Sequence, residues 1–267
     1  MPDPRYIVLL FVTLFAAAGV GTLVRAFLPE RHRSRESIEL VQLTITLLVT
    51  FTSIVLALLT GSVKTGFDEA YQARGIYAAA FVQMDQCLRD YGPETEPMRA
   101  ELRSYVAASI ASTWPDEPPP ANIAYPDTKA MPLTGESPLL GEILDKARTQ
   151  LRRLQPTDSL HQRVLSDCLD EFSDLMKRRW AVIEAPQQSI APPFYWVLTL
   201  WLVILFASFG LTAPPNPVTI IVVALSALSI TLAVGVIADL DQPYGGFFGI
   251  SSDSMRDALA DMTRPSP

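Results

Sequence analysis

The chain has 267 residues, of which 49% are hydrophobic and 18% are charged, and its net charge is −7. An acidic chain without a basic stripe and interleaved aromatic residues has no surface suited to nucleic acid. The two cysteines do not form a CxxC pair, and the two histidines have no partner at metal-ligand spacing, so no metal site or cofactor is predicted. Enzymatic activity is not expected either, because the sequence has no P-loop, GxSxG or HExxH motif.

Apolar residues are concentrated in four runs that alternate with polar sequence. A helix needs about 20 apolar residues to cross a bilayer. We therefore predict an all-α membrane protein with spans at about 7–27, 40–60, 194–212 and 218–240. Each pair of spans is expected to form an antiparallel hairpin, which leaves both termini on the side of the central segment.

The first span has two features of its own. Ala17 and Gly21 form a small-xxx-small pair that allows close helix packing. The run before Gly19 also resembles the cleavage site of a signal peptide, which is the alternative interpretation. The apolar run is longer than a usual signal sequence, and this favours a span.

Charged residues are concentrated between the two hairpins, where the apolar spacing is helical. The second span is expected to continue into a helix beyond Gly61, followed by helices at 95–113, 137–154 and 157–185 and a proline-rich loop at 114–126. These patterns divide the chain into a hairpin (1–60), a helical extramembrane domain (61–190), a second hairpin (191–240) and a tail with a short helix (241–267).

The two cysteines lie at matching distances from the membrane. Cys87 follows Gly61 by 26 residues, and Cys168 precedes Phe194 by 26 residues, so unbroken helices would bring them to similar heights. The sequence favours two buried, unpaired residues. The alternative is a disulfide, which requires an oxidising compartment.

The second span carries a polar stripe. Gln42, Thr46, Thr50 and Ser53 follow one another at steps of four, four and three residues and therefore share one helix face. In an oligomer this face would offer hydroxyl and amide groups to a permeating ion. Hydrogen bonding between helices explains the same pattern, and it is the more frequent role of such residues in membranes.

Two acidic groups flank the spans. Asp68 and Glu69 follow the second span and are candidates for a vestibule or ion contact, although a solvated helix face is the simpler reading. After the fourth span, we expect the carboxylates of Asp239 and Asp241 to cap a turn. The turn is built around one proline and two glycines, namely Pro243, Gly245 and Gly246.

The positive charges do not settle the orientation. Arg25, Arg31, Arg33 and Arg35 in and beside the first loop favour a cytoplasmic loop and an external domain. Lys64, Arg74 and the run 177–179 lie close to the membrane on the opposite side.

The order of these parts resembles a family. The segment FDEAYQARGIYAAAF (67–81), the long helix before the third span and the segment DLDQPYGGFFGISSDSMRDAL (239–259) are similar to bacterial bestrophin-like membrane proteins. The resemblance implies a distant likeness to bestrophins, which are pentameric anion channels with a cytoplasmic helical domain. The neck residues and calcium ligands of bestrophins cannot be matched to positions in this sequence.

The sequence thus predicts an oligomeric protein of the bacterial inner membrane that forms an ion channel or permeation pathway. The resemblance implies a pentamer, and the predicted partners are the lipid bilayer, further copies of the chain and small ions. The alternative is a membrane-anchored scaffold or sensor whose helical domain binds a partner without transport.

Overall fold

The computed structural model describes residues 4–27, 35–129, 131, 137–184, 192–214 and 216–264. These residues form helices and loops, and no strand occurs among them. The predicted all-α class is therefore confirmed. The described part of the chain has four helices that are long and apolar enough to cross a membrane, and they correspond to the four predicted spans.

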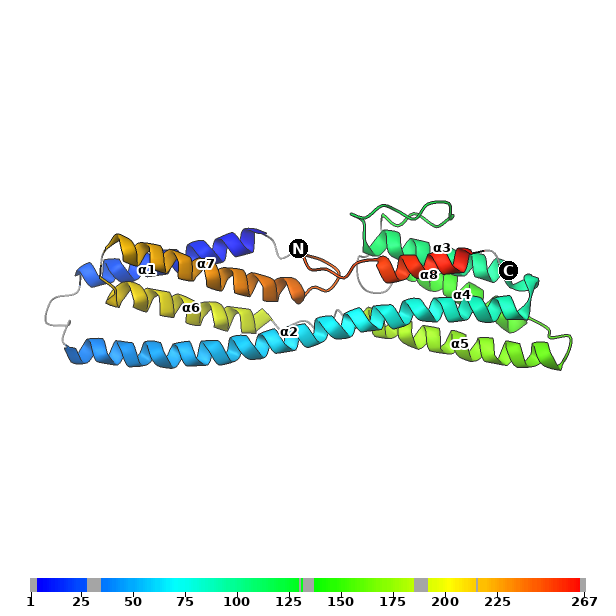
Figure 1. Ribbon diagram of the computed structural model, residues 1–267, viewed down its shortest axis with the longest axis horizontal. Coiled ribbons are helices and arrows are strands. Elements are labelled where there is room, and N and C mark those ends of the chain that lie inside the picture. Colours follow the sequence, from blue (N-terminus) through cyan, green and yellow to red (C-terminus); the bar gives the residue numbers. More distant parts are fainter. Residues whose placement is uncertain are drawn as a thin grey trace. The chain divides into compact units, whose positions relative to one another are not determined.

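The structure divides into two compact units (Figure 1). The first, which we call the membrane unit, comprises Met1–Thr65 and Ser189–Phe248. The second, the helical unit, comprises Gly66–Gln188 and Gly249–Pro267. Helix α2 (Arg35–Tyr91) contributes residues to both units, as the uninterrupted apolar and then amphipathic pattern predicts.

Helix α2 is long because nothing in its sequence interrupts it. Its 57 residues include no proline, so every residue can donate its backbone N–H. The helix ends at Tyr91, where Gly92 has a φ of 140° that other residues rarely adopt. Pro93 then begins a short 3-10 helix, Pro93–Thr95.

In the membrane unit, α1 (Pro4–Phe27) packs most closely on α6 (Pro192–Thr212) and also on α7 (Pro217–Leu240). Gly21 lies against the backbone of Ala207, and Gly210 lies against the backbone of Ala18, so the two helices approach more closely than larger residues allow. At the ends of both helices, the Arg25 guanidinium donates a hydrogen bond to the Ala213 carbonyl. Because Arg25 is in the last turn of α1 and Ala213 directly follows α6, the C-terminal ends of the two helices lie together and the helices run in the same direction.

The small residues of the first span, which were predicted to allow close packing, therefore lie at its contact with the third span. Buried leucine and phenylalanine side chains complete this core, among them Leu14, Leu202 and Phe206. The pairing of the first two spans as a hairpin stays a prediction. The second pair is joined by a turn in which the Asn216 side chain accepts a hydrogen bond from the Thr219 N–H at 2.8 Å and caps α7.

The helical unit is built from the second part of α2 and four further helices. These are α3 (Glu96–Thr113), α4 (Pro138–Arg153), α5 (Ser159–Glu184) and α8 (Asp253–Thr263). Helix α3 packs on α4 and on α8. The short helix of the tail thus belongs to the same unit as the helices that precede the third span.

A disulfide bond joins Cys87 of α2 to Cys168 of α5, with 5.6 Å between their Cα atoms. The preferred interpretation of two unpaired cysteines is therefore wrong, and the alternative is correct. The reason is geometric, because both helices place their cysteines at the same level and facing each other. Cys168 is fully buried and Cys87 is half-buried.

Candidate functional site

The part of α2 in the membrane unit has three distinct faces. At 100° per residue, the four polar residues predicted to line a pore span about 80° of arc. The structure places the side chains of all four, Gln42, Thr46, Thr50 and Ser53, on the exposed surface. The structure thus shows one exposed polar stripe along the span, and its role as a pore lining stays a prediction.

The hydroxyl groups of this stripe are oriented by the helix itself. Thr46 donates to the Gln42 carbonyl at 2.9 Å, Thr50 to the Thr46 carbonyl at 2.9 Å, and Ser53 to the Val49 carbonyl at 2.7 Å. Because each hydrogen is used within the helix, the oxygen lone pairs point outward as acceptors. Such oxygens can coordinate a cation or accept from water.

The other two faces of the span are mainly apolar. One is buried and includes Thr52, Leu59 and Val63, of which Leu59 belongs to the core of the membrane unit. The third face is exposed and consists of large residues, namely Leu43, Leu47, Phe51, Ile54 and Leu58. The polar stripe therefore lies between a face that packs within the chain and an apolar face left open for lipid or another chain.

The two acidic residues beyond the span, Asp68 and Glu69, are both exposed on α2. They belong to the helical unit and not to the membrane unit that carries the polar stripe. This placement is not evidence that they act together with the stripe. Their role as ion contacts stays a prediction.

The segment after α7 folds around Asp239, which is buried. Its carboxylate accepts hydrogen bonds from the backbone N–H groups of Phe247 at 2.9 Å and Phe248 at 2.8 Å. Gly246, directly before Phe247, has a φ of 90°, and a side chain there would overlap the Asp239 carboxylate. Asp239 therefore occupies the place that a capping residue requires, and only glycine fits opposite it.

The other residues of this turn have separate roles. Gly245 donates its N–H to the Gln242 carbonyl at 3.1 Å, closing a tight turn around Pro243. Asp241 accepts a hydrogen bond from the Tyr195 hydroxyl at 3.3 Å, which ties the end of α7 to the start of α6. The four predicted turn residues and Asp239 are thus brought together in one small loop.

Sequence reasoning missed two aromatic residues at this loop. Phe247 is 88% exposed and Phe248 is 49% exposed, and their rings meet edge to face with centroids 5.2 Å apart. Exposed aromatic rings beside a span are typical of a membrane–water boundary or of a contact between subunits. The signal in the sequence was their position directly after two glycines.

In the described ranges, no three histidine, cysteine or acidic side chains are grouped for a metal ion. These features together define the class of the protein. It is an all-helical membrane protein with a polar stripe on one span and a helical unit outside the apolar spans.

Comparison with known proteins agrees with this class and makes it specific. The Bestrophin-like domain matches residues 12–255, which is most of the chain. The protein belongs to the Bestrophin-like family, so the resemblance seen in the sequence is confirmed. No curated protein matches the chain significantly.

Solved structures show the same fold. Three variants of a bacterial bestrophin homologue from Klebsiella pneumoniae are similar to the chain. The first has a TM-score of 0.66 at 16% identity and covers 98% of this chain and 97% of its own. The second has 0.64 at 16% identity, and the third has 0.63 at 15%, each covering 97% of this chain and 99% of its own. At this level of identity the likeness establishes the fold alone.

Proposed function

We propose that copies of this chain assemble around a common axis and form an ion channel, with the polar stripe of α2 as the pore lining. The observation that carries the proposal is the exposure of all four stripe residues on a membrane-spanning helix. An amide such as that of Gln42 is costly to place in hydrocarbon without a partner. An aqueous axis removes that cost.

The apolar exposed face beside the stripe supports an assembly and not a monomer. If the stripe faces an axis, the leucine-rich face turns toward the α2 helix of a neighbouring copy. The buried face, whose Leu59 belongs to the core of the membrane unit, turns away from the axis. A single orientation of the helix therefore gives each of its three faces a suitable environment: water, a neighbouring copy and the core of the same chain. This is the arrangement expected in a ring.

Family membership adds to this proposal. Bestrophins are pentameric anion channels, and a pentamer is accordingly the assembly we propose for this chain. The hydroxyl acceptors of the stripe are compatible with a hydrated ion of either charge. We therefore propose a small inorganic ion as the permeant species and leave its sign to experiment.

We also propose that the chain lies in the bacterial inner membrane with its helical unit on the outer, oxidising side. The Cys87–Cys168 disulfide supports this side, because disulfides persist in oxidising compartments. The arginines near the first loop favour the same orientation through the positive-inside rule, whereas Lys64, Arg74 and the run 177–179 favour the opposite one, so the disulfide carries the proposal. This orientation differs from the cytoplasmic placement of the domain that the resemblance implied.

Flux through liposomes tests the channel. The detergent-purified protein is first sized, and the oligomeric fraction is reconstituted into vesicles loaded with chloride or potassium. We expect flux above that of empty vesicles. A monomer in mild detergent, or a correctly assembled oligomer with no flux of either ion, would overturn the proposal in favour of a scaffold or sensor.

A further inference from the structure

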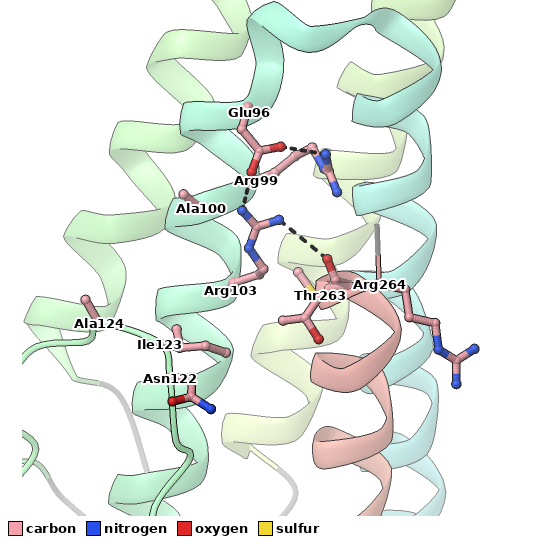
Figure 2. A pocket seen from close by; sticks show the side chains of 10 residues that line it. Glu96, Arg99, Ala100, Arg103, Asn122, Ile123, Ala124, Thr263 and Arg264 are labelled. Atoms are coloured by element: carbon pink, nitrogen blue, oxygen red, sulfur yellow. Dashed lines mark hydrogen bonds and ion pairs between the residues drawn. The ribbon is translucent and has the colours of Figure 1, made fainter. Parts of the chain in front are cut away.

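The helical unit holds a cavity of about 570 Å³ that none of the predicted site residues lines. Three segments form it, namely one face of α3, the loop 122–124 and the end of α8 (Figure 2). Three of its lining residues are arginines, Arg99, Arg103 and Arg264. A volume of this size is in the range of pockets that hold small organic molecules.

The charged groups around the cavity do not balance. Two carboxylates, Asp85 and Glu96, lie among the guanidinium groups of Arg89, Arg99 and Arg103. Asp85 and Arg89 stand beside the cavity and do not line it, and Arg264, which lines it, is paired with Asp261. Arg89 binds Asp85 at 2.7 Å, and Arg99 binds Asp85 at 2.8 Å and Glu96 at 2.6 Å. Arg103 also binds Glu96. The cluster therefore carries one excess positive charge, before any ligand is considered.

The arginines are fixed by contacts that do not depend on Glu96. Arg89 and Arg103 donate to the Met262 carbonyl at 3.1 Å and 3.4 Å, which caps the end of α8. Arg99 is held by the buried carboxylate of Asp85. The side chains of Arg99 and Arg103 are only 11% and 17% exposed, so their guanidinium groups are held in place.

Glu96 is the most exposed member of this cluster. Its side chain is 51% exposed, and its carboxylate lies between Arg99 and Arg103 at the edge of the cavity (Figure 2). The hydrogen bond from Arg103 holds the pKa of Glu96 below its ordinary value. The guanidinium groups of Arg99 and Arg103 thus hold a carboxylate at a position that is half open to solvent.

The remaining walls suit an organic group. Ala100, Ile123, Ala124 and Met262 contribute apolar surface beside the guanidinium groups. Asn122, which adopts a positive φ of 64°, adds an amide on the loop side. A purely inorganic anion would leave this apolar surface unused.

We propose that the cavity binds a small organic anion that carries two negative charges on carboxylate or phosphate oxygens and displaces Glu96 from Arg99 and Arg103. With Glu96 turned away, Arg89, Arg99 and Arg103 are balanced only by the carboxylate of Asp85, and a dianion bound by Arg99 and Arg103 restores neutrality. Paired guanidinium groups are the usual ligands of such oxygens. The site stands apart from conduction, since a chain that forms no pore would still bind the anion.

Calorimetric titration of the full-length protein in detergent tests the site, with succinate and inorganic phosphate as probes. Succinamide, which has the same carbon chain without charge, serves as the ligand control at constant ionic strength. We expect succinate to bind and succinamide not to bind. Binding of phosphate alone would indicate an inorganic anion and overturn the organic class. Binding of neither anion would overturn the site.

Two variants locate the binding. Glu96→Gln removes the internal competitor, and we expect succinate to bind about tenfold more tightly. Arg103→Gln removes a ligand, and we expect about a tenfold loss or more. Arg148→Gln, an exposed arginine on α4, is the matched control and should bind as the wild type does. Arg103 also caps α8, so the gain in Glu96→Gln is the decisive result, and unchanged affinity in that variant would overturn the proposal.

Discussion

Cys87 of α2 and Cys168 of α5 form a covalent link between residues 81 positions apart in the sequence. A link across so long a segment restricts the unfolded chain, and the stabilisation is typically about 2–4 kcal/mol. We expect reduction of the wild-type protein with dithiothreitol to lower its unfolding free energy by about this amount. Chemical denaturation of reduced and oxidised protein measures the difference, and equal midpoints would contradict the prediction. A double variant without both cysteines is the control, and it should not respond to the reductant.

The proposed orientation predicts which introduced thiols are accessible in intact cells. Ala121 is exposed in the proline-rich loop of the helical unit. In an Ala121→Cys variant the introduced cysteine is the reactive thiol, because Cys87 and Cys168 are bonded to each other and do not react with a maleimide. We expect a membrane-impermeant maleimide to label this variant without cell lysis. Ala213→Cys, in the turn between α6 and α7, is the control and should be labelled only after lysis. The reverse pattern would place the helical unit in the cytoplasm.

The pore proposal predicts a difference between two threonines of the same helix. Thr50 lies on the polar stripe, whereas Thr44 is exposed outside it, and both hydroxyls donate to the carbonyl four residues earlier. Valine removes the hydroxyl and keeps the shape. Because a hydrogen bond contributes about 0.5–1.5 kcal/mol, we expect Thr50→Val to change relative ion permeability by about 2- to 10-fold. Thr44→Val should leave flux through liposomes unchanged, and equal effects of both variants would contradict a pore at the stripe.

Sequence patterns predicted local structure well in this protein and long-range contacts less well. The helix α2 was predictable because no proline interrupts 57 residues of apolar and then amphipathic pattern. The contact of Gly210 with Ala18 was not predictable, because small residues indicate that two helices approach closely but do not show which helix is the partner. The matching distances of the cysteines from the membrane allowed a disulfide but did not require one.

The arginine-lined cavity could not be predicted from the sequence either, because it depends on long-range contacts. Arg99 and Arg103 look like exposed positions of an amphipathic helix. Their meeting with the end of α8 depends on a contact between segments 159 residues apart. The exposed stripe of α2 was easier to find, since its residues follow one helical period within a single span. Local periodicity can be recognised in the sequence, whereas a cavity depends on how distant segments pack together.

The contact between Glu117 and α8 predicts a pH dependence of stability. Burial raises the pKa of Glu117, but hydrogen bonds from Ser252 and Arg256 outweigh this effect and lower the pKa below its ordinary value. The Arg256 guanidinium lies 3.1 Å from the carboxylate. A lowered pKa means that the stabilising contribution is present above the ordinary pKa of a glutamate, about 4.3, and is lost as the pH falls through the lowered value.

We therefore expect Glu117→Gln to be less stable than the wild type at pH 7 and closer to it in acid. Thermal unfolding between pH 7 and pH 3 measures the difference. Asp116→Asn, at the exposed neighbouring position, is the control and should follow the wild type across this range. A gap that stays constant with pH would show that the charge of Glu117 is not the stabilising feature.

The close contact of α1 and α6 predicts opposite effects of alanine at two glycines. A side chain at Gly210 would overlap the Ala18 carbonyl, which is backbone and moves only if the helices separate. We expect Gly210→Ala to cost about 1–3 kcal/mol, the usual range for overpacking. Gly19 lies on α1 with open space around its Cα, so Gly19→Ala should be neutral or stabilising by up to about 1 kcal/mol. Thermal unfolding in one detergent compares the two variants, and an equal melting temperature would mean that α1 and α6 do not make this contact in the folded protein.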